Sequence, residues 1–201
     1  MRGVEVLCKL ASNLRTLRRF VHVSTADVYG YPDKMVDETY DLVETHLPYN
    51  RSKVRGEKIV WDYYNKHNMP VTVVRPSNIY GPRGKHFVEP ILDTMRTGML
   101  LSGALGIVTN KVFAGIAPLI SGGRTLSGLV YVDHVAQAMI DAAFSSNTLG
   151  EAYNLCDEPA VTWGEYYQKL SQASGISTKW IAMPFWLCYF FAYILEWVRR
   201  A

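Results

Sequence analysis

The chain has 201 residues, which suits one domain or one and a half, and 49% of them are hydrophobic against 19% charged. This composition excludes a disordered or low-complexity protein, because enough apolar surface can be buried to offset the entropy lost on folding. The formal net charge of +3 is spread along the sequence and gives no basis for nucleic-acid binding.

The first predicted element is an N-terminal amphipathic helix. The first twenty residues hold five basic residues and one acidic residue. Apolar residues recur among them at the spacing of one helix face, at Val4, Leu7, Leu10, Leu14 and Leu17. We predict that this face is buried in the core and that the basic last turn suits the helix dipole. A mitochondrial transit peptide is the alternative that so basic a start raises.

A strand, a helix and a second strand follow. Residues 20–24 form a short apolar run that ends in small polar residues, as expected of a buried parallel strand. A helix is predicted at about residues 49–67 and a second buried strand at residues 71–74. Arg75 and Pro76 should end that strand, since proline cannot donate a ladder hydrogen bond and restricts the residue before it. A crossover of this length joins parallel strands, so the predicted fold class is α/β.

The second half of the chain continues the alternation. A strand at residues 129–132 leads into a helix at residues 133–144, for which Asp133 is a candidate N-cap. A strand at residues 152–155 and a helix at residues 162–174 complete the series, and Thr162 and Glu165 are spaced as a capping box.

Tyr49 and Lys53 stand four residues apart on the predicted helix at residues 49–67, so their side chains share one face. An ammonium group beside a phenol favours the phenolate, which lets the tyrosine act as a general acid or base near neutral pH. Ser24 and Thr25 close the preceding strand, and α/β proteins gather ligands at the carboxyl ends of their parallel strands. This Tyr–Lys spacing also occurs by chance in many proteins. The catalytic interpretation therefore depends on Ser24 and Thr25 at the end of the preceding strand.

Five segments occur in an order that resembles a known family. They are residues 21–30 (VHVSTADVYG), Tyr49 with Lys53, residues 75–82 (RPSNIYGP), residues 131–136 (YVDHVA) and residues 153–155 (YNL). Together these segments resemble the extended short-chain dehydrogenase/reductase family, also called the NAD-dependent epimerase/dehydratase family. The resemblance implies a partial Rossmann-like parallel sheet, NAD or NADP as cofactor, and hydride transfer to or from a hydroxyl-bearing small molecule.

The resemblance also implies roles for single residues. Tyr49 would be the general acid/base, Lys53 would promote its ionisation and bind the ribose hydroxyls, and Thr25 would orient the substrate hydroxyl, with Ser24 as the less favoured candidate. The implied cofactor-binding residues are Ser24, Tyr49, Lys53, Arg75, Pro76, Ser77 and Asn78. The last four would form a loop against the nicotinamide, for which an ordinary strand-ending turn is the structural alternative.

Substrate class is left open between two branches of the family. Asp27 stands where the sugar-nucleotide dehydratases carry an acidic base, although a loop-capping carboxylate is the simpler interpretation. Arg83 and Arg124 are candidate substrate contacts or solvated loop charges. Residues 99–120 are apolar, with Lys111 as the only charge, which slightly favours a 3β-hydroxysteroid dehydrogenase-like enzyme acting on a sterol or lipid over a nucleotide-sugar enzyme.

The predicted domains follow from the same resemblance. Residues 1–81 would be the C-terminal part of an NAD(P)-binding domain, and residues 82–201 mainly a substrate-binding region, with residues 129–155 returning to the first domain. The sequence lacks the glycine-rich turn that holds the pyrophosphate in this family. We therefore expect a fragment or N-terminally short form of a longer enzyme, which alone binds NAD(P) weakly or not at all. A non-catalytic binding module is the alternative from a different class.

The C-terminal segment is uncharged from residue 180 to 195, which falls short of the ~20 residues that span a bilayer. We predict a buried helix or a helical interface there. Its aromatic residues and the following Arg199 and Arg200 make contact with a membrane surface through residues 180–200 the alternative.

The remaining candidates point to structural roles. His22 is predicted to be a hydrogen-bonded core histidine and His134 to be structural. No cluster of residues has metal-ligand spacing. The three cysteines, at positions 8, 156 and 188, predict no disulfide framework and fit a reducing, cytoplasmic compartment, with membrane association if the C-terminal segment binds lipid. A homodimer is left open.

Overall fold

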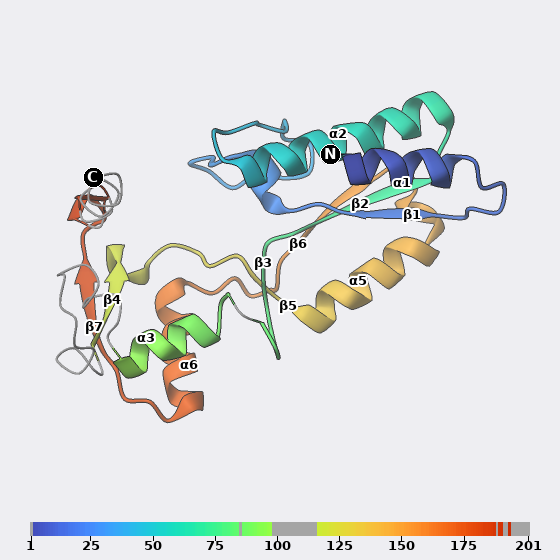
Figure 1. The fold of residues 1–201 in the computed structure, drawn as a ribbon. Coiled ribbons are helices and arrows are strands. Elements are labelled where there is room, and N and C mark those ends of the chain that lie inside the picture. The colour runs from blue at the N-terminus through green and yellow to red at the C-terminus, as the bar shows by residue number, and fades with distance from the viewer. Residues whose placement is uncertain (1, 85, 98–115, 188, 191–192, 194–201) are drawn as a thin grey trace. The chain divides into compact units, whose positions relative to one another are not determined.

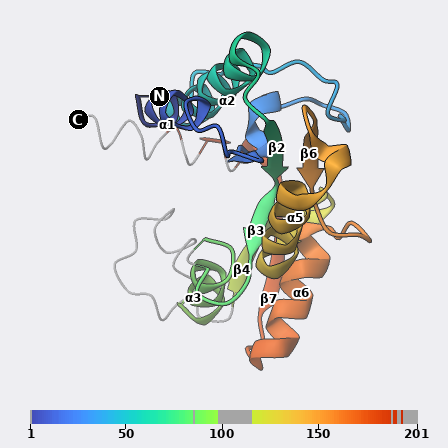
Figure 2. The same ribbon diagram turned by 90° about the vertical axis from the view of Figure 1, so that its right-hand side faces the viewer.

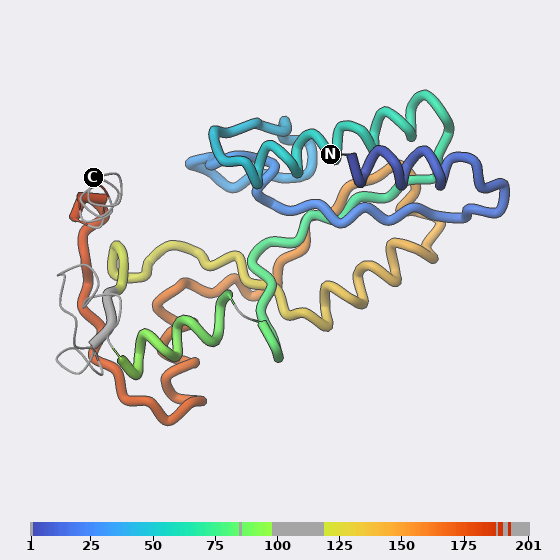
Figure 3. Tube along the Cα trace, viewed as in Figure 1, coloured from blue at the N-terminus to red at the C-terminus, as the bar shows by residue number. Residues whose placement is uncertain are grey.

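The structure is a computed structural model that describes residues 2–84, 86–97, 116–187, 189–190 and 193. Within it the chain divides into two compact units. The first unit comprises Met1–Ile79 and Val130–Asp157, and the second comprises Tyr80–Leu129 and Glu158–Ala201. Figure 3 traces the chain as it leaves the first unit, returns to it and leaves it again. The assignment of one unit to the cofactor and the other to the substrate stays a prediction.

A parallel three-stranded sheet with the order β1-β2-β6 forms the centre of the first unit. Its strands are β1 (Phe20–Val23), β2 (Val71–Pro76) and β6 (Ala152–Leu155). Helices α1 (Arg2–Ser12) and α2 (Pro48–His67) cover one face, and α5 (Val132–Phe144) covers the other (Figures 1 and 2). The predicted α/β class and the Rossmann-like parallel sheet are confirmed.

Strand β2 is the central strand, and all six of its residues are buried. The prediction that it ends at residue 74 is wrong. Arg75 and Pro76 still pair in parallel register with Asn154 and Leu155 of β6. Proline is tolerated because it is the last residue of the strand, and the ladder ends where Ser77 N donates to the Leu155 carbonyl oxygen, at 3.0 Å.

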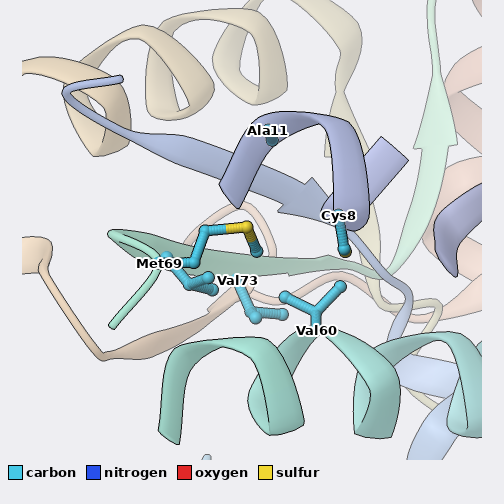
Figure 4. Packing of buried hydrophobic residues seen from close by; sticks show 6 residues of the cluster. Cys8, Ala11, Val60, Met69 and Val73 are labelled. Atoms are coloured by element: carbon cyan, nitrogen blue, oxygen red, sulfur yellow. The ribbon is translucent and has the colours of Figure 1, made fainter. Parts of the chain in front are cut away.

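The core of the first unit lies between the sheet and helices α1 and α2. Cys8 and Ala11 of α1 meet Val60 of α2 over Met69 and Val73 (Figure 4). Four of these side chains are less than 2% exposed, and Ala11 is 9% exposed. Close packing of this kind fixes the two helices on the sheet.

Helix α1 contradicts part of the prediction made from its sequence. The helix ends at Ser12, and its packed face is formed by Val4, Cys8 and Ala11. Leu7 and Leu10, predicted to be buried, are 58% and 61% exposed. Apolar residues lie on more than one side of this helix, so periodicity alone could not tell which side meets the core.

The other short elements of the first unit are η1 (Ala26–Tyr29), η3 (Ser146–Thr148), β3 (Asn78–Tyr80) and β5 (Leu129–Tyr131), of which the last two continue into the second unit. Asp133 was predicted as the N-cap of α5, but the N-cap is Tyr131, without a side-chain hydrogen bond. Asp133 lies in the first helical turn, where a carboxylate still suits the helix dipole.

The second unit contains α3 (Glu89–Thr97), β4 (Ile116–Ile120), η2 (Ser121–Gly123), α6 (Trp163–Ser174) and β7 (Lys179–Met183). The predicted capping box of α6 is confirmed, with Thr162 and Glu165 exchanging hydrogen bonds. Gly123 has a φ of +67°, and a Cβ there would lie 2.7 Å from the Gly164 backbone nitrogen, so glycine permits the close approach of η2 to α6.

The prediction of a helix beginning at Trp180 is wrong for its first residues. Residues 180–183 belong to β7, which pairs in parallel with β4. Beyond Pro184, large aromatic side chains are more than half exposed: Phe185, Trp186, Tyr189, Phe190 and Tyr193. Cys188, Trp197, Arg199 and Arg200 and most of the apolar stretch at residues 99–120 lie outside the described residues.

Candidate active site

The first turn of α2 is held in place by a buried asparagine. Asn50 is 1% exposed. Its Nδ2 donates to the carbonyl oxygens of Asp27 and Val43, and its Oδ1 accepts from Thr45 N at 2.7 Å. One side chain thus fixes the start of the helix against η1 and the loop before it, and Tyr49 is the preceding residue.

Tyr49 and Lys53 lie together at the carboxyl end of β1. Lys53 Nζ donates to the Val23 carbonyl oxygen at 3.2 Å and lies 5.9 Å from the centre of the Tyr49 ring. Tyr49 is 54% exposed. The structure therefore places a tethered ammonium group beside an accessible phenol, as the spacing in sequence predicts.

Ser24 and Thr25 follow directly after β1, but they face different surroundings. Thr25 is the N-cap of η1, and its Oγ1 accepts from Asp27 N at 3.3 Å. The N-cap of η1 is therefore the Thr25 hydroxyl, and Asp27 lies in the first turn of η1. The roles of the Asp27 carboxylate as a loop cap or as an acidic base stay predictions. Ser24 is 4% exposed, and its hydroxyl lies beside Glu57 closely enough to help lower that carboxyl's pKa, although the geometry falls short of a hydrogen bond.

The carboxylate of Glu57 and the guanidinium group of Arg75 form a buried ion pair. Arg75 Nε lies 3.1 Å from Glu57 Oε1, and Arg75 Nη2 donates to the same carboxylate. Glu57 is fully buried and Arg75 is 4% exposed. Burial by itself raises the pKa of Glu57, but the hydrogen bonds and charge of Arg75 outweigh it and hold the pKa below its ordinary value. The pair is therefore ionised at neutral pH.

Arg75 also connects the ion pair to its neighbours. Its Nη1 donates to the Tyr29 hydroxyl at 2.6 Å and to the Glu38 carbonyl oxygen at 3.2 Å. The Tyr29 hydroxyl in turn donates to Asn154 Oδ1 at 2.7 Å. All three guanidinium nitrogens of Arg75 are hydrogen-bonded within the first unit, and its predicted contact with a cofactor stays a prediction.

The other predicted site residues are placed as follows. Pro76 is the last buried residue of β2, Ser77 follows it, and Asn78 begins β3. Arg83 and Arg124 are exposed residues of the second unit. Their contact with substrate stays a prediction.

The two histidines differ from each other. Nε2 of His22 is buried without a hydrogen-bond partner, so the predicted hydrogen-bonded core histidine is wrong for that atom. Burial lowers the pKa of His22, while the charge of Glu57 opposes the shift. His134 is exposed, and its Nδ1 lies 2.7 Å from Asp157 Oδ1.

The described part of the chain contains neither a candidate metal site nor a candidate membrane-spanning helix. No group of three or more histidine, cysteine, aspartate or glutamate side chains there could hold a metal ion. No helix among those residues has the length and apolar character needed to cross a bilayer.

Reasoning from sequence missed four polar residues that hold this site together, namely Tyr29, Asn50, Glu57 and Asn154. Glu57 had a usable signal, because it follows Lys53 by four residues and so extends the Tyr49–Lys53 face by one turn. The charged Arg75 at the end of a buried strand was a second signal, since a buried charge requires a partner.

Comparison with known proteins supports a family relationship. The sequence profile of the NAD dependent epimerase/dehydratase family matches residues 1–156. A trifunctional UDP-glucose 4,6-dehydratase of Arabidopsis thaliana is 27% identical over 157 residues, covering 76% of this chain and 21% of the relative. The dTDP-D-glucose 4,6-dehydratase of Homo sapiens is 40% identical over 81 residues, covering 40% of this chain and 23% of the relative. A 3beta-hydroxysteroid dehydrogenase/Delta(5)-Delta(4) isomerase of Caenorhabditis elegans is 26% identical over 185 residues, covering 90% of this chain and 37% of the relative.

Solved structures show the same fold. The UDP-glucuronic acid 4-epimerase of Bacillus cereus, in complex with UDP-glucuronic acid and NAD, superposes with a TM-score of 0.68 at 21% identity, covering 91% of this chain and 54% of that one. The dTDP-glucose 4,6-dehydratase of Streptomyces venezuelae, with NAD bound, superposes with a TM-score of 0.65 at 24% identity, covering 90% and 52%. The chain thus spans about half the length of these structures.

Proposed function

Because the chain belongs to the NAD-dependent epimerase/dehydratase family, we propose that Tyr49, Lys53 and Thr25 form the proton-transfer part of a hydride-transfer site. The observation that carries this proposal is the tether of Lys53, which reaches the Val23 carbonyl oxygen while lying beside the Tyr49 ring. The tether places both side chains at the carboxyl end of a parallel strand, where ligands of α/β proteins bind. The activity would be that of an NAD(P)-dependent oxidoreductase or epimerase.

Each residue has hydrogen-bonding capacity that fits this role. One of the three N–H bonds of Lys53 is used on Val23, which leaves two for ribose hydroxyls and for the phenolate. Thr25 Oγ1 accepts from Asp27 N, so its own O–H is able to donate to a substrate oxygen. Tyr49 would exchange a proton with the substrate hydroxyl. A bound nicotinamide cofactor supplies the exchange of hydride with the substrate carbon.

The adenosine half of the cofactor needs a turn with three glycines at the spacing G-x-G-x-x-G or G-x-x-G-x-x-G, and the sequence contains no such turn. We therefore keep the expectation that the isolated chain binds NAD(P) weakly or not at all.

We propose a nucleotide sugar as the first substrate class. The support comes from the curated relatives and from the epimerase structure solved with UDP-glucuronic acid. A sterol or other hydroxylated lipid is the second candidate, because the hydroxysteroid dehydrogenase relative matches 185 residues whereas the plant dehydratase matches 157. Contact with a membrane surface through residues 180–200 belongs to this second candidate, and the exposed aromatic side chains after Pro184 support it.

The test uses the protein with a C-terminal tag added to its own gene, so that any upstream segment is retained. Purified protein is given NAD or NADP together with nucleotide sugars in one series and 3β-hydroxysteroids in the other, and products are identified by mass spectrometry and NMR. Tyr49→Phe should lower kcat by about 10²-fold or more, because a general acid/base contributes this much. Tyr31→Phe, at a tyrosine that is 66% exposed, is the matched control and should not change kcat.

Unchanged turnover in Tyr49→Phe would refute the proposal. The non-catalytic binding module would be favoured by a different result. In that case the protein turns over neither nucleotide sugars nor 3β-hydroxysteroids, and wild type and Tyr49→Phe bind the same partner molecules equally well.

A further inference from the structure

The ion pair between Glu57 and Arg75 is a costly feature to place in a core. Both side chains are buried, and transferring two charges out of water is repaid only by very good geometry. Apolar residues of similar volume often give equal or greater stability at such positions. Stability alone is therefore a weak reason for this pair.

The location of Glu57 on α2 suggests a reason other than stability for the buried ion pair, namely the positioning of that helix. Tyr49, Lys53 and Glu57 follow one another at intervals of four residues, so they form one stripe along the helix. A helix advances 1.5 Å and turns 100° per residue, so holding one residue of the stripe limits both the sliding and the rotation of the others. Glu57 is the deepest of the three, and Arg75 holds its carboxylate with two nitrogens.

Arg75 also contacts the other segments that carry predicted site residues. Through Nη1 it holds Tyr29, the last residue of η1, the short helix that Thr25 caps. Its own backbone lies at the end of β2, directly before Pro76, Ser77 and Asn78. One guanidinium group therefore links α2, η1 and the end of β2.

We infer that Glu57 and Arg75 are positioning residues, which fix α2 on the sheet so that Lys53 Nζ stays on the Val23 carbonyl oxygen beside Tyr49. This inference rests on the proposed function for its catalytic meaning, but the geometry it describes can be measured without turnover. The Lys53 hydrogen bond is 3.2 Å long, so a shift of about 1 Å in the helix would break it.

The test measures how fast an amine-reactive acetylating reagent modifies Lys53, using peptide mass spectrometry on the C-terminally tagged protein. Lys58, exposed on the same helix, is the internal reference. In Glu57→Gln the acetylation rate of Lys53, relative to that of Lys58, should rise about five-fold, because one hydrogen bond provides about this much protection. Glu44→Gln is the matched control. Glu44 lies in the loop before α2 and forms an exposed ion pair with Arg55 of that helix, so its substitution should leave the Lys53 rate unchanged.

A second variant separates positioning from stability. Glu57→Leu with Arg75→Met replaces the ion pair by apolar side chains and should retain most of the stability. We expect its Lys53 rate to stay raised and its kcat to fall by about 10²-fold with little change in KM, since an error of about 1 Å in a catalytic group has this effect. A double variant that folds stably and shows the wild-type Lys53 rate would overturn the inference.

Tyr29→Phe keeps the inference testable if the charge variants fail to fold. It removes only the hydrogen bonds of the Tyr29 hydroxyl, and it should raise the Lys53 rate by less than Glu57→Gln does. An unchanged rate there, with both charge variants unfolded, would show that the cluster serves stability alone. A failure of the proposed function would be recognised separately, because turnover would then be unchanged in Tyr49→Phe.

Discussion

Replacing Glu57 by glutamine should strongly destabilise the first unit. The substitution keeps the shape of the side chain but removes its charge and leaves Arg75 buried without a counter-ion. The carboxylate accepts hydrogen bonds from the charged groups Arg75 Nε and Nη2, and each contributes about 1.5–3 kcal/mol. Together they predict a loss of about 3–6 kcal/mol, which overlaps the cost of about 3–5 kcal/mol that is usual for breaking a buried ion pair.

The assay is unfolding in urea, followed by hydrogen exchange of the peptide that contains β2, because this strand is buried along its full length. Glu44→Gln is again the control. Its ion pair with Arg55 is exposed, so its loss should cost no more than about 1 kcal/mol. If Glu57→Gln costs as little as Glu44→Gln, the buried pair does not hold the unit together as described.

The same variant predicts a pH dependence with a definite sign. Because the pKa of Glu57 is lower in the folded protein than its ordinary value of 4.5, the carboxylate stabilises the fold above that value. This stabilisation is lost as the pH falls through the lowered pKa. The difference in stability between wild type and Glu57→Gln should therefore be constant near neutral pH and shrink below pH 4.5. A difference that grows on acidification would contradict the assignment of the charge to Glu57.

Three further outcomes follow from single positions. Asn50→Ala should lower the stability of the first unit by about 1–3 kcal/mol, as thermal unfolding would show, because buried backbone groups lose their partner. Gly123→Ala should destabilise the second unit more than Gly122→Ala. Both glycines have positive φ, but a Cβ at residue 123 would lie 2.7 Å from the Gly164 backbone nitrogen, whereas a Cβ at residue 122 meets nothing closer than 3.9 Å. Equal losses of stability in the two variants would argue against the close approach at Gly123. Iodoacetamide should alkylate Cys8 far more slowly than the exposed Cys156, because burial both shields the Cys8 thiol and raises its pKa. Peptide mass spectrometry measures both alkylation rates, and similar rates would contradict the packing of α1.

Local signals predicted much of the first unit. The helix at residues 48–67 and the parallel strands beside it follow from apolar runs, from their lengths and from the crossover between them. The Thr162–Glu165 capping box was also readable, because capping depends on residues close in sequence. Such features need no knowledge of what packs against them.

Features that depend on distant residues were missed. The buried side of α1 is set by what α2 and the sheet offer, so Leu7 was placed inside although it is exposed. Residues 180–183 form a strand because β4 provides a partner, which an uncharged segment cannot reveal. Glu57 was overlooked because its significance depends on Arg75, eighteen residues further along the chain.

The strand order of the first unit has a practical consequence for handling the protein. With the order β1-β2-β6, the outer edge of β1 has no strand against it within the described part of the chain. Backbone N–H and C=O groups along such an edge can pair with any extended peptide that approaches it. Three of the four residues of β1 are apolar and the fourth is His22, and the strand lacks the lysine or proline residues that commonly discourage such pairing. Concentrated preparations of the isolated chain should therefore associate edge to edge, and a peptide that caps β1 should improve their solubility.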